Sequence, residues 1–185
     1  RVLVGSEMCI RERFYYYDAD GSVGSISYDY TRYAFRKNLQ GDVIAILDTN
    51  GDVVARYAYD AWGKVLSVTD KDGNTITDAN HVANINPIRY RGYYYDTETG
   101  WYYLNSRYYD PSVKRFINAD GIIGANGNFT GMNLFAYCNN NPVIFSDPTG
   151  HYSDIDIYGP HLQYGSGGYQ PGFRVEDYDL SLIHI

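Results

Sequence analysis

Residues 89 to 120 read RYRGYYYDTETGWYYLNSRYYDPSVKRFINAD, and residues 133 to 151 read NLFAYCNNNPVIFSDPTGH. In both stretches, short runs rich in tyrosine alternate with Asp, Asn, Gly and Pro. Tyrosine favours β-strands, whereas the other residues favour tight turns. These stretches therefore predict short strands that are joined by hairpin turns.

The same pattern of Tyr, Asp and a closing Gly occurs three times along the chain. It spans residues 17–21, 59–63 and 95–100. The Asp side chain can accept a hydrogen bond from the backbone two residues on, and Gly supplies the positive φ that a tight turn requires. We therefore interpret this spacing as structural and not as catalytic.

Alternation of apolar and polar residues predicts an all-β, antiparallel fold. The clearest hairpin joins residues 43–47 to residues 53–59, and Val53, Ala55, Tyr57 and Tyr59 fall on one face of its second strand. Further predicted elements are strands at 63–68, 88–95 and 101–107, a polar loop at 70–86, and short helical turns near 111–116 and 132–138.

The composition limits the classes of partner. The 185 residues include 22 Tyr and 19 Gly, and the net charge is −7. An acidic chain without a cluster of Lys or Arg argues against binding of nucleic acid and against an anionic membrane surface. The sequence contains no apolar run long enough to cross a membrane as a helix, and no nucleotide-binding or nucleophile motif of a metabolic enzyme.

Both ends of the sequence look artificial. Residues 4–11 and 180–185 resemble the two strands of one translated sequencing adapter, so we assign 1–13 and 180–185 to an artefact. Cys9 then falls outside the genuine insert, which leaves Cys138 alone and excludes a disulfide framework there. A buried, small apolar role is the expected one for Cys138.

An ordered series of motifs resembles the core that ends an RHS (rearrangement hotspot, or Tyr-Asp repeat) shell. The series comprises Gly92–Asp96, Thr99–Leu104, Arg107–Pro111, Arg115–Phe116, Asn139–Pro142 and Asp147–Gly150. The resemblance implies a hollow β-shell that encloses a C-terminal toxin. It divides the chain into Tyr-Asp hairpins and a loop at 14–85, the RHS core at 86–151, and a poorly ordered start of a variable C-terminal region at 152–179.

The resemblance also implies a catalytic site, because many such cores are intramolecular aspartyl proteases. Asp147 matches the aspartate of the final Asp-Pro-x-Gly motif, and Asp120 matches that of the preceding motif, although Gly121 replaces the usual Pro. Cleavage is expected between His151 and Tyr152, where the family often has Leu before the bond. Two enclosed carboxyls could divide the roles of general acid and general base. The alternative is that both aspartates only form turns.

The resemblance further implies the partners and the location of the parent protein. The partners expected in the same polypeptide are upstream shell repeats and a C-terminal toxin or effector. The partner expected as a separate protein is an immunity protein for the toxin. The parent is expected to be secreted, to lie at the cell surface or to be delivered by a secretion system. The alternative function is a surface adhesion module that binds carbohydrate or protein through tyrosine-rich faces, without catalysis.

No cofactor or metal is expected. The segments 48–52 and 70–74 contain acidic residues in a calcium-like arrangement, yet neither has the Glu that an EF-hand places at the twelfth position. We interpret both as turns. The histidines have no Cys or His partners at the spacing of a zinc site.

Overall fold

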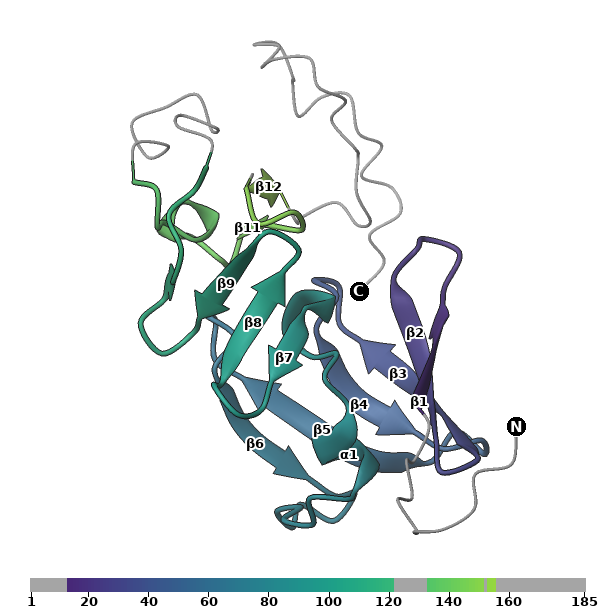
Figure 1. The fold of residues 1–185 in the computed structure, drawn as a ribbon. Coiled ribbons are helices and arrows are strands. Elements are labelled where there is room, and N and C mark those ends of the chain that lie inside the picture. Colours follow the sequence, from purple (N-terminus) through teal and green to yellow (C-terminus); the bar gives the residue numbers. More distant parts are fainter. Residues whose placement is uncertain (1–12, 122–132, 152, 156–185) are drawn as a thin grey trace, which may run out of the picture.

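A computed structural model describes residues 13–121, 133–151 and 153–155, and antiparallel sheet dominates it. This confirms the predicted all-β class. The first sheet has six strands that pair in chain order. They are β1 (Arg13–Tyr17), β2 (Val23–Tyr28), β3 (Thr31–Lys37), β4 (Val43–Leu47), β5 (Val53–Tyr59) and β6 (Val65–Thr69) (Figure 1).

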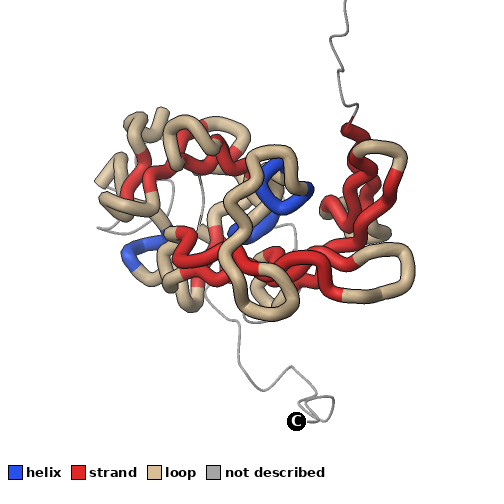
Figure 2. Tube along the Cα trace, turned by 90° about the horizontal axis from the view of Figure 1, so that it is seen from below, coloured by secondary structure: helices blue, strands red, loops and turns tan. Residues whose placement is uncertain are grey.

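The second sheet has four strands in the order β10-β9-β8-β7. They are β7 (Tyr94–Asp96), β8 (Trp101–Leu104), β9 (Arg107–Asp110) and β10 (Arg115–Phe116). A separate pair joins β11 (Phe145–Ser146) to β12 (Asp154–Ile155). Figure 2 shows how little helix the described chain contains; the short helices are α1 (Val82–Ile85), η1 (Tyr90–Gly92) and η3 (Cys138–Asn140).

Aspartate builds the turns that follow β4, β5 and β6, and at Asp60 the Tyr-Asp-Gly spacing predicts such a turn. Oδ1 of Asp60 accepts hydrogen bonds from the backbone N–H of Trp62 and of Lys64, each at 2.9 Å. Gly63 closes the turn on the carbonyl of Asp60 and has a φ of +85°. Asp48 and Asp70 accept the equivalent pairs of backbone bonds. Their carboxylates therefore serve the hairpin turns.

The first sheet buries one face under α1. Along β5, Ala55 and Tyr57 are buried while Arg56 and Ala58 are exposed, so the predicted alternation is confirmed. The hydroxyl of Tyr57 donates to the carbonyl of Ala83 in α1 at 2.6 Å. This bond satisfies a buried phenol and fixes the helix on the sheet, because an unpaired buried hydroxyl would be costly.

Buried tyrosines connect the two sheets. The hydroxyls of Tyr90, Tyr102 and Tyr109 donate to the carbonyls of Ala61, Gly63 and Trp62, at 3.0, 2.8 and 2.8 Å respectively. All three acceptors lie in the turn between β5 and β6. The rings also pack on one another, with Tyr102 and Tyr109 stacked 6.4 Å apart. The second sheet is therefore held in place by hydrogen bonds to one turn as well as by apolar burial.

Several predicted elements differ from the structure. Residues 111–114 form a turn with a helical bond from Lys114 N–H to the carbonyl of Asp110, and β10 occupies 115–116, so the helical turn predicted near 111–116 is shorter than expected. No helical turn is described at 133–137; η3 follows there, and its residues 138–140 have positive φ, while residue 132 lies outside the described residues. The loop at 70–86 contains α1, and the strand predicted at 88–95 is interrupted by η1. The periodicity of the sequence misplaces such short elements, because tertiary hydrogen bonds decide where they form.

Candidate functional site

Asp147 closes the turn that follows β11. Its Oδ1 accepts hydrogen bonds from the backbone N–H of Gly150 at 2.8 Å and of His151 at 3.0 Å. Its own N–H donates to the hydroxyl of Tyr93 at 3.0 Å. Only 2% of Asp147 is exposed. The carboxylate thus holds the backbone just before the bond that is expected to break.

The same turn is anchored on the β8–β9 connection. Asn105 Nδ2 donates to the carbonyl of Pro148 at 2.9 Å, and Ser106 Oγ donates to that of Thr149 at 2.8 Å. Gly150 has a φ of +76°, and a Cβ there would lie 2.4 Å from the carbonyl oxygen of Leu104. Only glycine meets both the backbone angle and the close approach, which explains the last residue of the Asp-Pro-Thr-Gly motif.

Asp120 comes from the segment after β10 and faces the same turn. Its backbone N–H donates to the carbonyl of Leu134 at 2.8 Å. Its Oδ2 lies 3.0 Å from Nη2 of Arg107, and its Oδ1 lies 2.9 Å from Nδ1 of His151. The side chain is only 7% exposed. The structure therefore brings Asp120 to the residue that precedes the expected cleavage point.

Arg107 in β9 joins the two aspartates. Nη2 of Arg107 lies 3.5 Å from Oδ2 of Asp147 in addition to its contact with Asp120. Nε donates to the carbonyl of Gly150, Nη1 donates to that of Leu134 at 3.0 Å, and the guanidinium lies over the ring of Phe116. Burial lowers the pKa of Arg107, while the two carboxylates act in the opposite direction. One buried guanidinium thus bridges both predicted site residues.

The sequence reasoning named both aspartates and the residue before the bond, but it assigned no role to Arg107 and no contact to His151. The signal for Arg107 was present in the alternation of β9, where Arg107 and Tyr109 are buried and Tyr108 is exposed. A buried arginine requires carboxylate or carbonyl partners. Tyr152, on the far side of the expected cleavage point, lies outside the described residues.

The arrangement has the parts for acid–base chemistry on a peptide bond. Two carboxylates, a guanidinium and an imidazole meet beside the backbone of Gly150 and His151. It differs from a pair of carboxyls in direct contact, because Nη2 of Arg107 contacts both Asp120 and Asp147.

A family model described as Teneurin YD-shell matches residues 12–143. The chain belongs to the Teneurin YD-shell family. The matched range contains Arg107 and Asp120 and ends before Asp147. Membership agrees with the Tyr-Asp hairpins of both sheets. It confirms that the chain is a Tyr-Asp repeat shell domain, as the resemblance of its motifs indicated.

Among the relatives of this YD-shell chain is the tRNA3(Ser)-specific nuclease WapA of Bacillus spizizenii, which is 41% identical over 138 residues. That match covers 75% of this chain and 6% of the relative. Toxin protein Tse5 of Pseudomonas aeruginosa is 40% identical over 73 residues, which are 40% of this chain and 5% of the relative. The chain thus spans a small part of the length of these relatives.

The YD-shell fold also matches solved structures. The crystal structure of TcdB2-TccC3-Cdc42 is similar with a TM-score of 0.60 and 25% identity, over 75% of this chain and 6% of that one. The Photorhabdus luminescens Tc holotoxin pore matches with a TM-score of 0.61 and 23% identity, over 77% and 6%. The latter likeness shows the fold alone.

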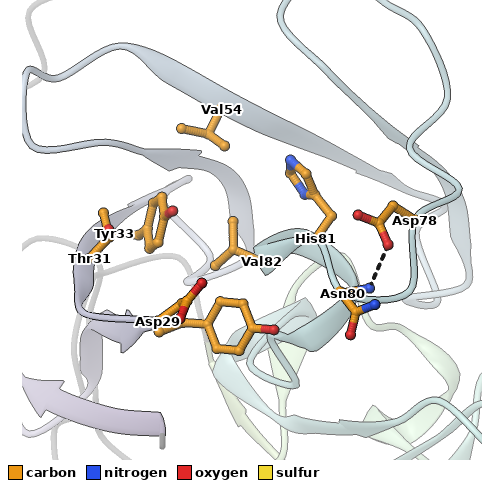
Figure 3. A pocket seen from close by; sticks show the side chains of 9 residues that line it. Asp29, Thr31, Tyr33, Val54, Asp78, Asn80, His81 and Val82 are labelled. Atoms are coloured by element: carbon orange, nitrogen blue, oxygen red, sulfur yellow. Dashed lines mark hydrogen bonds between the residues drawn. The ribbon is translucent and has the colours of Figure 1, made fainter. Parts of the chain in front are cut away.

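The YD-shell chain has a second feature, a pocket that neither Asp120 nor Asp147 lines (Figure 3). It lies between the β2–β3 turn and the residues before α1, and its lining includes Tyr33, Val54, Asp78, Asn80 and His81. Asp78 accepts from Asn80 N–H at 2.9 Å, and Nδ1 of His81 accepts from the first turn of α1 at 3.2 Å. These polar groups therefore have local structural roles.

Within the described ranges, no helix is long and apolar enough to span a membrane. Among the same residues, no group of three or more His, Cys, Asp or Glu side chains is arranged to hold a metal ion. Cys138 is buried, as expected, and burial raises the pKa of its thiol.

Proposed function

We propose that this chain is the C-terminal core of an RHS-type shell, which encloses an effector in the same polypeptide and separates from it by self-cleavage between His151 and Tyr152. One observation carries the proposal. Asp120 and Asp147, distant in sequence, both contact Arg107 beside the backbone of Gly150 and His151. A turn-forming role alone would not require them to meet.

The contacts suggest a division of roles between the aspartates. Asp147 accepts two backbone N–H bonds, which stabilise its carboxylate form and suit a general base that activates water. Asp120 contacts the imidazole of His151, and we assign to it the return of a proton to the leaving amine. Arg107 contacts both carboxylates, donates to the carbonyl of Gly150 and is assigned a positioning role.

The wider role follows from the relatives, which carry the names of a tRNA nuclease and of a toxin. The upstream repeats would complete the shell wall, and the effector would follow His151 in the chain. The parent would be secreted or delivered by a secretion system, and an immunity protein would protect the producing cell. Cleavage would then separate the cargo from the wall.

The test uses the full parent chain, with its upstream repeats and downstream region, and measures the intact mass after purification. We expect two fragments whose masses correspond to cleavage of the chain after His151. Asp120→Asn and Asp147→Asn should remain uncleaved, whereas Asp48→Asn, which alters a turn carboxylate in the first sheet, should cleave normally. A folded parent that stays intact would contradict self-cleavage.

A second candidate function, a binding module without catalysis, is favoured by an exposed aromatic row on the second sheet. Tyr94 pairs with Tyr103, which in turn pairs with Tyr108, and each residue is 41–50% exposed. The rings of Tyr103 and Tyr108 are 5.1 Å apart. Such rings stack on the apolar faces of sugars. Glycan-array binding that is lost on changing all three to Ser would support this function, and an array without binding would count against it.

A further inference from the structure

Tyr93 holds the backbone of Asp147 from outside the Asp-Pro-Thr-Gly turn. It follows η1, and its hydroxyl accepts a hydrogen bond from the backbone N–H of Asp147 at 3.0 Å, across 54 positions of the sequence. Tyr93 is 8% exposed and Asp147 is 2% exposed, so the bond lies away from solvent. A buried N–H that loses its acceptor is costly. The first residue of the turn is therefore tied to a distant side chain.

This bond supplies an anchor that β11 does not. In the described part of the chain, β11 has two residues and pairs with β12, which also has two. Neither strand belongs to the six-stranded or to the four-stranded sheet. Asn105 and Ser106 hold residues 148 and 149, whereas the hydroxyl of Tyr93 holds Asp147 itself. The position of the Asp147 carboxylate relative to Arg107 therefore depends on Tyr93.

Tyr93 is in turn fixed by other buried tyrosines. Its ring packs edge-on against those of Tyr90 and Tyr102, with centroids 6.2 and 6.4 Å apart. Both of those phenols donate to the turn between β5 and β6. The backbone N–H of Tyr93 also donates to the carbonyl of Tyr90 at 2.9 Å. The docking of the second sheet on the first thus sets the place of the Tyr93 hydroxyl.

Burial confines Tyr93 to a positional role. It raises the pKa of the phenol well above its ordinary value, because the phenolate would be desolvated. The hydroxyl therefore keeps its proton at neutral pH. Such a phenol can orient a backbone group, but it does not act as an acid or a base.

We propose that Tyr93 is a positioning residue for self-cleavage, because its hydroxyl fixes the backbone that carries the Asp147 carboxylate. The inference rests on the proposed function and makes self-cleavage depend on the docking of the two sheets. Without the hydroxyl, the start of the turn can move while the ring still fills its place in the core. Cleavage then slows although the wall of the shell stays folded.

Tyr109 provides a matched control. It belongs to the same buried cluster, is 0% exposed, and donates from its hydroxyl to the carbonyl of Trp62 at 2.8 Å. Changing either Tyr93 or Tyr109 to Phe keeps the ring and removes a buried bond to the backbone, so both variants should lose similar stability. They differ in the partner of that bond, which is Asp147 for Tyr93 and the turn between β5 and β6 for Tyr109.

The experiment refolds the full parent chain and both variants from urea and follows the cleaved fraction by intact mass. We expect Tyr93→Phe to cleave at least about tenfold more slowly, because a misplacement of about 1 Å can cost about a hundredfold in rate. Tyr109→Phe should cleave at nearly the unchanged rate. Urea unfolding, followed by tryptophan fluorescence, measures the stability of each chain. Sucrose is added to all samples if a variant folds incompletely, because it favours the folded state.

Hydrogen exchange supplies a readout that lost stability alone would not give. It is measured by mass spectrometry in the Asp120→Asn background, in which the parent is expected to stay uncleaved. Tyr93→Phe should speed exchange in the peptide that contains the N–H of Asp147 and leave β8 and β9 as protected as before. Tyr109→Phe should leave that peptide unchanged.

The outcomes separate this inference from the proposed function. If Tyr93→Phe and Tyr109→Phe slow cleavage equally, the hydroxyl of Tyr93 contributes only stability and the inference is wrong. Slow cleavage of Tyr93→Phe with faster exchange throughout the second sheet also counts against it. If Asp147→Asn abolishes cleavage while Tyr93→Phe cleaves at the unchanged rate, self-cleavage stands without a role for Tyr93. A folded, unchanged parent that never cleaves overturns both.

Discussion

Replacing Gly150 by Ala should test whether the Asp-Pro-Thr-Gly turn depends on its close contact with the second sheet. The matched control is Gly51→Ala, because both glycines have a positive φ, +76° and +86°. A Cβ at Gly150 would lie 2.4 Å from the backbone oxygen of Leu104, whereas one at Gly51 would have no heavy atom within 4 Å. The two variants therefore share the backbone strain and differ in the contact.

The expected magnitudes follow from that difference. A left-handed backbone angle costs a residue with a Cβ about 1–2 kcal/mol, and this applies to both positions. At Gly150 the turn must also move away from β8, which breaks the bonds from Asn105 to Pro148 and from Ser106 to Thr149. Each is worth about 1 kcal/mol. We expect Gly150→Ala to lose about 3–4 kcal/mol of unfolding free energy.

Urea unfolding of the chain, followed by the fluorescence of its two tryptophans, measures both variants. In the parent chain, Gly150→Ala should also slow self-cleavage, since the carbonyl of Gly150 leaves Arg107. Equal losses of stability for Gly51→Ala and Gly150→Ala would refute the reasoning, because they would show that the contact with Leu104 contributes nothing.

Three further changes have defined outcomes. Burial raises the pKa of Tyr57 and Tyr90 to about 12. The contribution of these two phenols to stability is therefore complete below their pKa of about 10 in the unfolded chain, and it is lost as the pH rises through about 12. In a pH titration, tyrosinate absorbance should show that both ionise after the exposed tyrosines. Asp60→Ala removes the acceptor of two turn bonds and should cost about 1–3 kcal/mol in urea unfolding, whereas Asp60→Asn, which keeps Oδ1, should cost less. Arg107→Met leaves the two aspartates without their shared cation and should cost about 3–5 kcal/mol by the same measure; a loss below 1 kcal/mol would contradict the buried bridge.

Local chemistry made part of the fold predictable from the sequence. The turns at Asp48 and Asp60 form because an Asp accepts backbone N–H groups two and four residues on, and Gly follows at the position of positive φ. The alternation in β5 reports burial, because successive side chains of a strand point to opposite faces. Such signals lie within a few residues and need no knowledge of the rest of the chain.

The short helices were not predictable in the same way. The α1 helix has only four residues, Val82 to Ile85, and His81 caps its N-terminus. So short a helix is not stable by propensity, and its position depends on the hydrogen bond from Tyr57 to Ala83 and on burial against the first sheet. Likewise β10 takes residues 115–116, the end of a predicted helical turn, because it pairs with β9.

The sequence by itself determined the all-β class, the Asp-Gly turns, the family resemblance and the two aspartates as candidates. The class and the turns depend on residue types at short, fixed spacing, and the two aspartates follow from the family resemblance that the motifs carry. The tertiary structure alone decided that Arg107 bridges Asp120 and Asp147 and that the imidazole of His151 contacts Asp120. Those contacts join residues 13 to 40 positions apart by sequence number, and only the packing of the second sheet against the turn after β11 brings their side chains into hydrogen-bonding distance.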